Sequence, residues 1–135
     1  EKTINAENFL EIPTLKRMDL QMQFTLNSGQ LNLSFEDKKI DILIKNTNDE
    51  KSIEVKSNTF LVSKMTLNDD DFQKINDIRI IAEENIIEIF LNDKTTVQAR
   101  VGLKLGTDKL KITADKEAKI NKLMGFRLKY REEVK

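Results

Sequence analysis

Residues 20–35 of the chain read LQMQFTLNSGQLNLSF. On both sides of the central Asn27-Ser28-Gly29 segment, every second residue is apolar and the residues between them are polar. Because successive side chains of a strand point to opposite faces of a sheet, this period of two is typical of half-buried strands. The stretch therefore predicts two neighbouring antiparallel strands that are joined by a turn at Asn27-Ser28-Gly29.

The same alternation continues outward from this hairpin. Polar segments at residues 46–50, 83–85 and 92–93 are expected to be turns or loops. The short connections indicate that strands adjacent in the sequence are neighbours in the sheet, as in a meander. Further strands are expected at residues 40–44, 53–55, 60–65, 78–82, 86–91, 95–105 and 110–112, and after Gly125.

Three segments carry the start and stop signals of short helices. Asn and Thr side chains accept hydrogen bonds from the first free N–H groups of a helix, whereas Gly and Pro commonly follow its end. We expect helices at residues 6–12 between Asn5 and Pro13, at residues 69–76 after Asn68, and at residues 114–124 between Thr113 and Gly125.

The expected fold class is α+β, mainly antiparallel β-sheet with about eight to ten short strands and two or three short helices. The chain has 135 residues, and its four glycines and single proline leave little material for a linker. We therefore expect a single domain over residues 1–135, in which residues 1–18 form a short helix and an extended lead-in.

Histidine, cysteine and tryptophan are absent, and Tyr130 is the only tyrosine. Histidine is the commonest general base and metal ligand near neutral pH, and disulfide and thiolate chemistry need cysteine. These absences exclude most catalytic triads, zinc sites and proton shuttles. We expect a non-catalytic protein without a cofactor, and an enzyme that uses carboxylates or lysines is the third alternative.

The compartment stays open at this stage. No apolar run approaches the roughly 18–20 residues that span a bilayer, so no membrane span is expected. No secretory pattern opens the chain, and because it begins with Glu1 rather than Met, we expect that processing or trimming removed an upstream piece. A cytoplasmic, a virion and a processed envelope protein all fit. The abundance of Lys, Ile and Asn indicates an AT-rich genome.

The formal net charge of zero is the sum of two opposite parts. Residues 1–99 hold 12 basic and 18 acidic side chains, whereas residues 100–135 hold 11 basic and 5 acidic ones. In the basic part, charged residues alternate with apolar ones, so they share one outward face if their strands share a sheet. This candidate basic face consists of Arg100, Lys104, Lys109, Lys111, Arg127, Lys129 and Arg131.

The two-signed surface favours a protein-interaction or assembly module whose partner is another protein or further copies of the chain. The alternative is a nucleic-acid-associated protein whose basic face binds phosphates. Phe126 and Tyr130 alternate with the basic residues and are therefore expected in the core. That placement leaves the basic surface without the aromatic platforms that bind single strands.

The Asp69-Asp70-Asp71 run is a weak candidate for a divalent cation site, since hard oxygen ligands suit Ca²⁺ or Mg²⁺. The run lacks the alternating ligands and the glycine of an EF-hand loop, and an acidic helix N-terminus is the favoured interpretation. Asn46, Asn48 and Glu50 do alternate, but a solvated hairpin loop is favoured for them. No resident metal is expected.

The order of elements between residues 3 and 105 resembles that of one domain of the DNA sliding-clamp family. The segments 60–67, 69–77, 78–82, 86–91 and 95–105 carry the resemblance, as a strand, a helix and three strands. The resemblance implies paired strand–helix–three-strand units and an association with DNA. Clamps are larger, however, and their DNA-facing helices are basic, whereas the expected helix at 69–76 is acidic and has Lys74 as its only positive residue.

Overall fold

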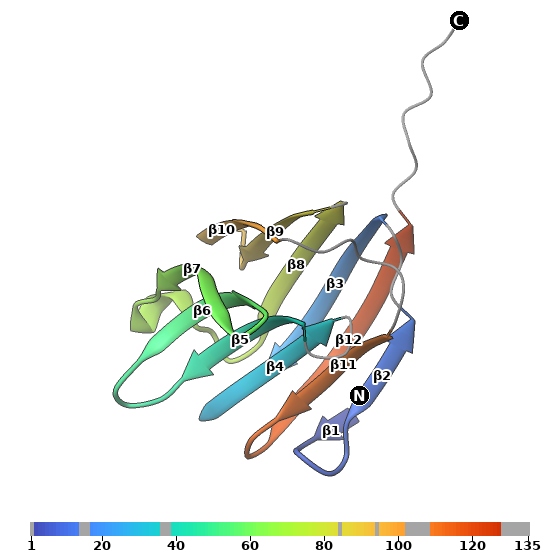
Figure 1. Cartoon of the computed structure of the whole chain (residues 1–135). Coiled ribbons are helices and arrows are strands. Elements are labelled where there is room, and N and C mark those ends of the chain that lie inside the picture. Colours follow the sequence, from blue (N-terminus) through green and yellow to red (C-terminus); the bar gives the residue numbers. More distant parts are fainter. Residues whose placement is uncertain are drawn as a thin grey trace, which may run out of the picture.

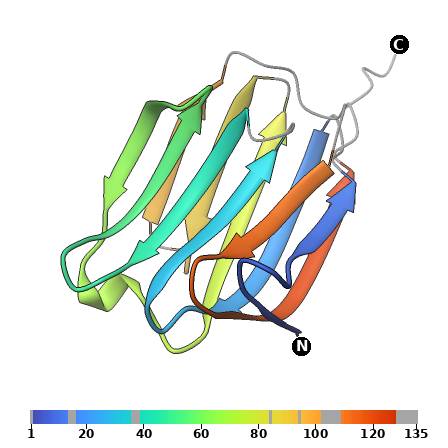
Figure 2. The same ribbon diagram turned by 60° about the horizontal axis from the view of Figure 1, so that its bottom comes forward.

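The computed structural model describes residues 2–13, 17–35, 39–83, 85–93, 95–101 and 109–127. Within these ranges the chain forms two six-stranded antiparallel sheets that pack face to face as a β-sandwich (Figures 1 and 2). In spatial order, sheet A consists of β1 (Lys2–Ile4), β12 (Ala118–Arg127), β3 (Arg17–Thr25), β8 (Asn76–Glu83), β9 (Ile86–Leu91) and β10 (Thr95–Arg100).

Sheet B faces sheet A across the core. It contains a meander of four strands, in which each strand pairs with the next along the chain. In spatial order, sheet B consists of β2 (Leu10–Pro13), β11 (Lys109–Ala114), β4 (Gly29–Phe35), β5 (Ile40–Asn46), β6 (Lys51–Ser57) and β7 (Phe60–Thr66). A single 3₁₀ turn, η1 (Asp69–Asp71), lies in the connection from β7 to β8.

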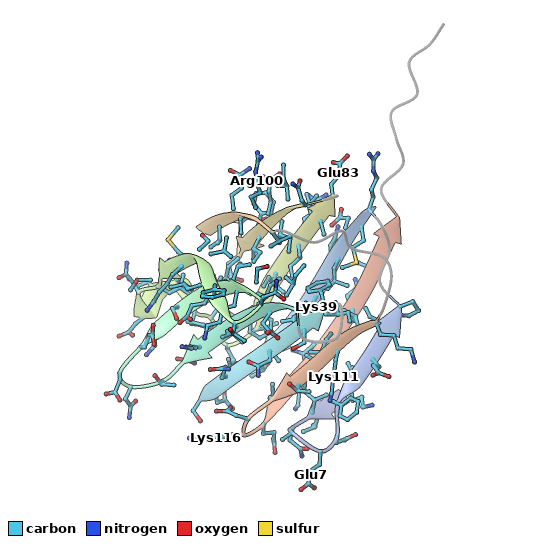
Figure 3. The ribbon with its side chains drawn as sticks, in the orientation of Figure 1. Glu7, Lys39, Glu83, Arg100, Lys111 and Lys116 are labelled. Atoms are coloured by element: carbon cyan, nitrogen blue, oxygen red, sulfur yellow. The ribbon has the colours of Figure 1, made fainter. Side chains whose placement is uncertain are left out.

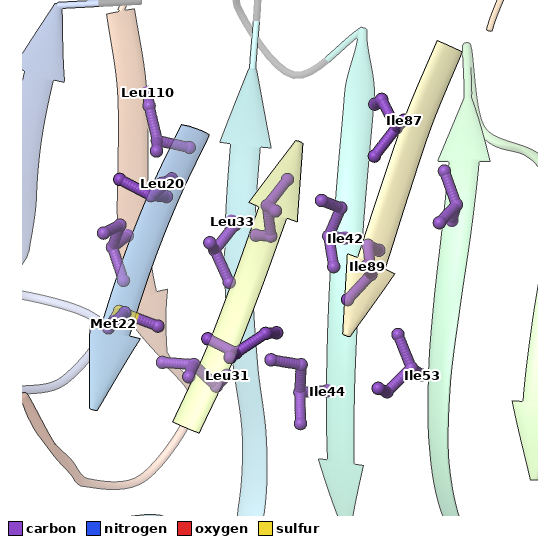
Figure 4. Close-up of a cluster of buried hydrophobic side chains, with 14 of the residues drawn as sticks. Leu20, Met22, Leu31, Leu33, Ile42, Ile44, Ile53, Ile87, Ile89 and Leu110 are labelled. Carbon is purple, nitrogen blue, oxygen red and sulfur yellow. The ribbon is translucent and has the colours of Figure 1, made fainter. Parts of the chain in front are cut away.

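The apolar residues of the alternating pattern fill the space between the sheets. Leu20 and Met22 of β3 and Leu31 and Leu33 of β4 are buried there, and Figure 4 shows them with isoleucines from β5, β6 and β9. Burial of each such side chain contributes about 1.5–3 kcal/mol relative to exposure, so the two apolar faces supply the main stabilisation. The predicted alternation is confirmed in β3, β4, β5, β8 and β9.

The pairing predicted for residues 20–35 is wrong. Strand β3 belongs to sheet A and β4 to sheet B, so these two strands face each other across the core and do not pair. The connection at residues 26–28 is therefore a turn between sheets. The predicted meander is correct for β4–β7 and for β8–β10, where strands adjacent in the sequence do pair.

Asp115 joins two of these sheet-crossing turns. Its carboxylate oxygen Oδ1 accepts hydrogen bonds from the backbone N–H groups of Gln30 (2.7 Å) and Lys116 (2.8 Å), and its own N–H donates to the Gln30 carbonyl (3.1 Å). Gly29 has a φ of 99°, and a Cβ there would meet Asp115 Oδ1 at 2.5 Å. The turns at residues 26–28 and 115–117 are thus held together by one carboxylate.

The fold class α+β is wrong, because the described residues contain no α-helix and fold as a β-sandwich. At the first expected helix, Asn5 Oδ1 does accept hydrogen bonds from the N–H groups of Glu7 (2.9 Å) and Asn8 (2.8 Å). The chain then continues into β2, which pairs with β11. The cap residue therefore closes a turn between two strands, because Asn side chains serve turns and helix caps alike.

The second and third expected helices are wrong for the same reason. At residues 69–76 the chain makes only η1, whose Asp71 carboxylate accepts a hydrogen bond from the Asn68 N–H (2.7 Å). Residues 114–124 form the end of β11, the turn at Asp115 and most of β12. Among the described residues, no helix is long and apolar enough to cross a membrane.

The sliding-clamp topology is wrong as well. The segment expected as its helix is the 3₁₀ turn η1, and the strands on either side of it, β7 and β8, belong to different sheets. A clamp-like unit needs its helix to pack on a sheet formed by those strands. The paired strand–helix–three-strand units are therefore absent from the described part of the chain.

Replacing the carboxylate that joins the crossing turns should destabilise the fold. Asp115→Ala removes the acceptor of two exposed backbone N–H groups, so the free energy of unfolding should fall by about 1–1.5 kcal/mol in urea titrations. Glu117→Ala, in the same turn, is the matched control and should change it by less than about 0.5 kcal/mol. Equal effects of both variants would contradict the role of Asp115.

Candidate functional site

The outer face of sheet B carries charged side chains at positions that alternate with the core. Strands β5, β6 and β7 lie side by side, and before the register shift at Val55/Lys56 their outward residues form rows across them. Cross-strand neighbours of this kind lie within contact distance of each other. The two rows are Lys45–Ser52–Thr66 and Leu43–Glu54–Lys64.

Two lysines and two glutamates on this face form one ion-pair network, which we call the Lys–Glu cluster (Lys45, Glu50, Ser52, Glu54 and Lys64). Lys45 Nζ lies 2.7 Å from Glu54 Oε2 and 3.7 Å from Glu50 Oε2. Lys64 pairs with Glu50 and lies 4.0 Å from Glu54 Oε2. The Ser52 hydroxyl donates to Glu50 Oε1 at 3.3 Å.

The cluster is unusually buried for the outer face of a sheet. Glu54 is 5% exposed, and Ser52 is fully buried. Leu43, which pairs with Glu54 across β5 and β6, is also buried. A carboxylate is stable in such a place only if it is paired, and Lys45 and Lys64 supply the opposite charge.

The pairing shifts the pKa values of Lys45 and Glu50 in the direction that favours their charged forms. The hydrogen bond with Glu54 raises the pKa of Lys45 above its ordinary value, against the opposing effect of burial. The hydrogen bond from Lys64 lowers the pKa of Glu50, with further contributions from the charges of Lys45 and Lys64. At neutral pH Lys45 is therefore an ammonium donor and Glu50 a carboxylate acceptor.

A hollow of about 690 Å³ adjoins the cluster and shares Glu50 and Lys64 with it. It lies between the β5–β6 hairpin and the segment at residues 66–69. The Thr47 side chain fixes the hairpin, because Thr47 Oγ1 accepts from the Glu50 N–H (3.0 Å) and donates to the Glu50 carbonyl (2.9 Å). The Leu67 N–H donates to the Lys51 carbonyl at 2.7 Å and fixes the other wall.

The hollow is lined mainly by hydrogen-bonding groups. Asn48, Thr66 and Asn68 add amide and hydroxyl groups to the charged ends of Glu50 and Lys64. Such a surface can donate and accept several hydrogen bonds at once, which suits a ligand rich in hydroxyl groups. Among the described residues, no group of three or more acidic side chains is arranged to hold a metal ion.

The structure disperses the candidate basic face. Arg100 ends β10 at the edge of sheet A, whereas Lys109 and Lys111 lie on β11 in sheet B. Figure 3 shows Arg100 and Lys111 in well-separated parts of the molecule. Because β10 and β11 belong to different sheets, the described residue Arg100 does not share a sheet face with Lys109 and Lys111. Lys104, Lys129 and Arg131, and the side chain of Arg127, lie outside the described part.

The basic residues that are described on β11 have partners on the β2 side. Lys109 Nζ lies 3.6 Å from Glu11 Oε1, and Lys111 Nζ lies 4.1 Å from the centre of the Phe9 ring as a cation–π contact. Two of the weak candidates for a metal site, Asp69 and Asp71, also have partners within the protein. Asp69 pairs with Lys51 at 3.2 Å, and Asp71 accepts from the Asn68 N–H.

Sequence reasoning missed the Lys–Glu cluster. From the sequence, Glu50 is expected only in a solvated loop, and no motif marks Lys45, Glu54 or Lys64. One signal was available, since the hairpin between β5 and β6 brings Lys45 and Glu54 onto the same face with opposite charges. The burial of Glu54 could not be inferred, because it depends on neighbours from both sides of β6.

No family model matches the chain, and no curated protein matches it either. Solved structures do match its fold. Sheep galectin-11, in a complex with glycerol, is 12% identical with a TM-score of 0.63, and the match covers 87% of this chain and 96% of the galectin. The carbohydrate-binding module CBM66 from Bacillus subtilis is 14% identical with a TM-score of 0.65, over 87% of this chain and 81% of the module.

A third similar structure is the exoplasmic/lumenal domain of VIP36, in a form with Ca²⁺ and Man3GlcNAc bound. It is 12% identical with a TM-score of 0.68, and the match covers 90% of this chain and 72% of that domain. Identities of this size demonstrate a shared fold and nothing finer. The chain therefore has the same β-sandwich fold as these three structures.

Acid should remove the stabilisation that Glu50 provides. Since its folded-state pKa is lowered, this contribution is complete above about pH 4.3, the ordinary pKa of glutamate, and is lost as the pH falls through the folded-state pKa. Glu50→Gln should therefore lose less free energy of unfolding than the parent between about pH 6 and pH 3 in urea titrations. Lys64→Met should show a similarly reduced loss. Parent-like losses in both variants would contradict the pairing.

Proposed function

We propose that this chain is a non-catalytic binding module whose Lys–Glu cluster and adjoining hollow bind a saccharide. The observation that carries the proposal is the buried Glu54, which holds two lysines at the outer face of sheet B beside a polar hollow of about 690 Å³. The similarity in fold to galectins and to a carbohydrate-binding module also supports saccharide binding.

Sugar hydroxyl groups both donate and accept hydrogen bonds, so they fit a surface that presents both kinds of partner. Lys64 can donate to a hydroxyl oxygen, and Glu50 can accept a hydroxyl proton. Hydrogen bonds to charged groups are stronger than those between neutral groups. Because the cluster orders these side chains in the folded protein, little side-chain entropy remains to be lost on binding.

The non-catalytic role rests on the state of the carboxylates. Glu50 has a lowered pKa, whereas a catalytic acid at neutral pH needs a raised one. Glu54 is committed to Lys45 and is almost inaccessible to a ligand. The chain also lacks the histidine and cysteine that most hydrolytic sites use. These features favour recognition over bond cleavage.

A glycan array followed by isothermal titration calorimetry of the best ligand tests the proposal. Lys64→Met and Thr66→Val should each weaken binding about tenfold, because each removes one hydrogen-bonding group from the hollow. Thr113→Val, on the same outer face but outside the hollow, is the matched control and should bind like the parent. An array without any bound glycan, or parent-like binding by both hollow variants, would overturn the proposal.

Assembly is a second candidate function, and one observation favours it. Strand β7 is the last strand of sheet B, and its first residues are large, apolar and exposed. Phe60, Leu61 and Val62 are 76%, 53% and 40% exposed. Exposed apolar residues on a sheet edge favour pairing with another strand. The charged residue of β7, Lys64, is paired with Glu50, which reduces its repulsion of a second copy.

Sedimentation velocity over a range of protein concentrations tests this assembly. The parent should sediment faster as its concentration rises, and the double variant Phe60→Ser, Leu61→Ser should remain monomeric at every concentration. Ile75→Ser, which changes an exposed apolar residue outside β7, should behave like the parent. A parent that is monomeric throughout would remove the support for assembly through β7.

A further inference from the structure

A second hollow lies on the outer face of sheet A, on the opposite side of the sandwich from the Lys–Glu cluster. Its volume is about 320 Å³, and strands β12, β3, β8 and β9 contribute to it. The pairing register places its side chains in two rows. One row is Met124–Gln21–Arg79–Phe90, and the other is Lys122–Gln23–Asp77.

The guanidinium of Arg79 is held in place beside this hollow. Its Nε and Nη2 groups donate to the two carboxylate oxygens of Asp19 at 2.9 and 2.6 Å. Asp19 is buried, and the hydrogen bond from Arg79 keeps the pKa of its carboxyl below the ordinary value. The side chain of Arg79 remains half exposed, so N–H groups that Asp19 does not use can reach a ligand.

On the acidic side of the hollow, hydrogen bonds hold the backbone at Asp77 against Asn92. Asn92 Oδ1 accepts from the Asp77 N–H (2.8 Å), and the Asn92 N–H donates to the Asp77 carbonyl (2.7 Å). Asn92 and Asp93 both have positive φ angles of 52° and 57°, a backbone conformation that Asn and Asp adopt more readily than most residues. The hairpin therefore holds the Asp77 and Asp93 carboxylates at one rim of the hollow.

Apolar and amide side chains complete the lining, and the Gln21 amide nitrogen also donates to Asp19 Oδ2 (3.5 Å). Phe90 and Met124 are partly exposed at the two ends of the first row. Gln21 and Gln23 place amide groups between them, and Lys122 is exposed. An aromatic face next to hydrogen-bonding groups of both kinds is complementary to a sugar ring, which has an apolar C–H face and hydroxyl groups around its rim.

The charges of the hollow determine the kind of sugar. Asp77 and Asp93 line the hollow, and Asp19, outside the lining, pairs with Arg79. Together these three carboxylates exceed the two cations, Arg79 and Lys122, by one negative charge. A carboxylate or sulfate on the ligand would meet this excess at short range. The balance therefore disfavours acidic sugars and favours neutral ones.

We propose that the sheet A hollow is a second, independent binding site for a neutral sugar residue. Phe90 packs against the ring, Arg79 and the two glutamines bind its hydroxyl groups, and the Asp77 carboxylate accepts from them. This inference goes beyond the site on sheet B and does not need it. If both sites bind, one copy of the chain carries saccharide sites on opposite faces and can bridge two glycans without a partner subunit.

Amide NMR titrations of the ¹⁵N-labelled full chain test the proposal. The probes are the methyl glycosides of glucose, galactose and mannose, with glucuronic acid as the acidic comparison. At least one neutral glycoside should shift amide signals of β3, β8 and β9 in a saturable manner, and glucuronic acid should bind about tenfold more weakly. Absence of saturable shifts on sheet A with every probe, or tighter binding of glucuronic acid, would overturn the proposal.

Variants separate the two sites. Phe90→Ala and Gln23→Ala should each weaken the sheet A titration about tenfold, and the glutamine variant covers the case in which loss of the aromatic ring impairs folding. Gln98→Ala, exposed on β10 outside the hollow, is the matched control and should bind like the parent. Parent-like binding by both hollow variants would refute this site.

The outcome is distinguishable from that for the sheet B site. Lys64→Met should leave the sheet A shifts unchanged while weakening glycan binding at the Lys–Glu cluster. Sheet A shifts that persist in Lys64→Met support the second site even if the first fails. Shifts confined to β5, β6 and β7 support the first site and refute the second.

Discussion

The mutual burial of two alternating apolar faces is the constraint on which the rest of the molecule depends. Each strand of the sandwich turns its apolar residues, such as Leu33 of β4 and Ile80 of β8, toward the opposite sheet. The polar residues between them must then point outward, because the side-chain period of a strand is two. Both candidate sites occupy such outward positions, and a shift of one residue in register would bury their charges and expose the core.

The turns that carry the chain between the sheets determine which outward residues become neighbours. The β4–β7 meander makes the Lys–Glu cluster from strands that follow one another in the sequence. The sheet A hollow is assembled differently, because β12 and β8 reach opposite sides of β3 only after the chain has crossed between the sheets. Asp115 and Gln30 link two of these crossings, so the hydrogen bonds at the turns indirectly support the hollow.

The two outer faces share one arrangement of charged side chains. On each face a buried carboxylate, Glu54 or Asp19, is paired with a basic side chain that is more exposed than the carboxylate itself. The carboxylate is stable only because it is paired, and the pairing in turn fixes the direction of the cation. A fixed cation beside a hollow can bind a ligand at little cost in side-chain entropy. The proposed saccharide sites depend on this arrangement more than on any single hydrogen bond to a ligand.

The alternation over residues 20–35 and its continuation were sufficient to predict most strands and the buried residues, because period-two burial is a local property. Local capping chemistry could not separate helices from turns, since Asn5 and Asn68 make much the same hydrogen bonds in either. Of the candidate sites, only the Lys45–Glu54 neighbourhood follows from one hairpin. The approach of Arg79 to Asp19, sixty residues earlier, depends on strand order. By itself, the sequence determined which face of each strand is buried. The tertiary structure decided which strands are neighbours, because pairing depends on where the chain crosses between the sheets and not on the local pattern.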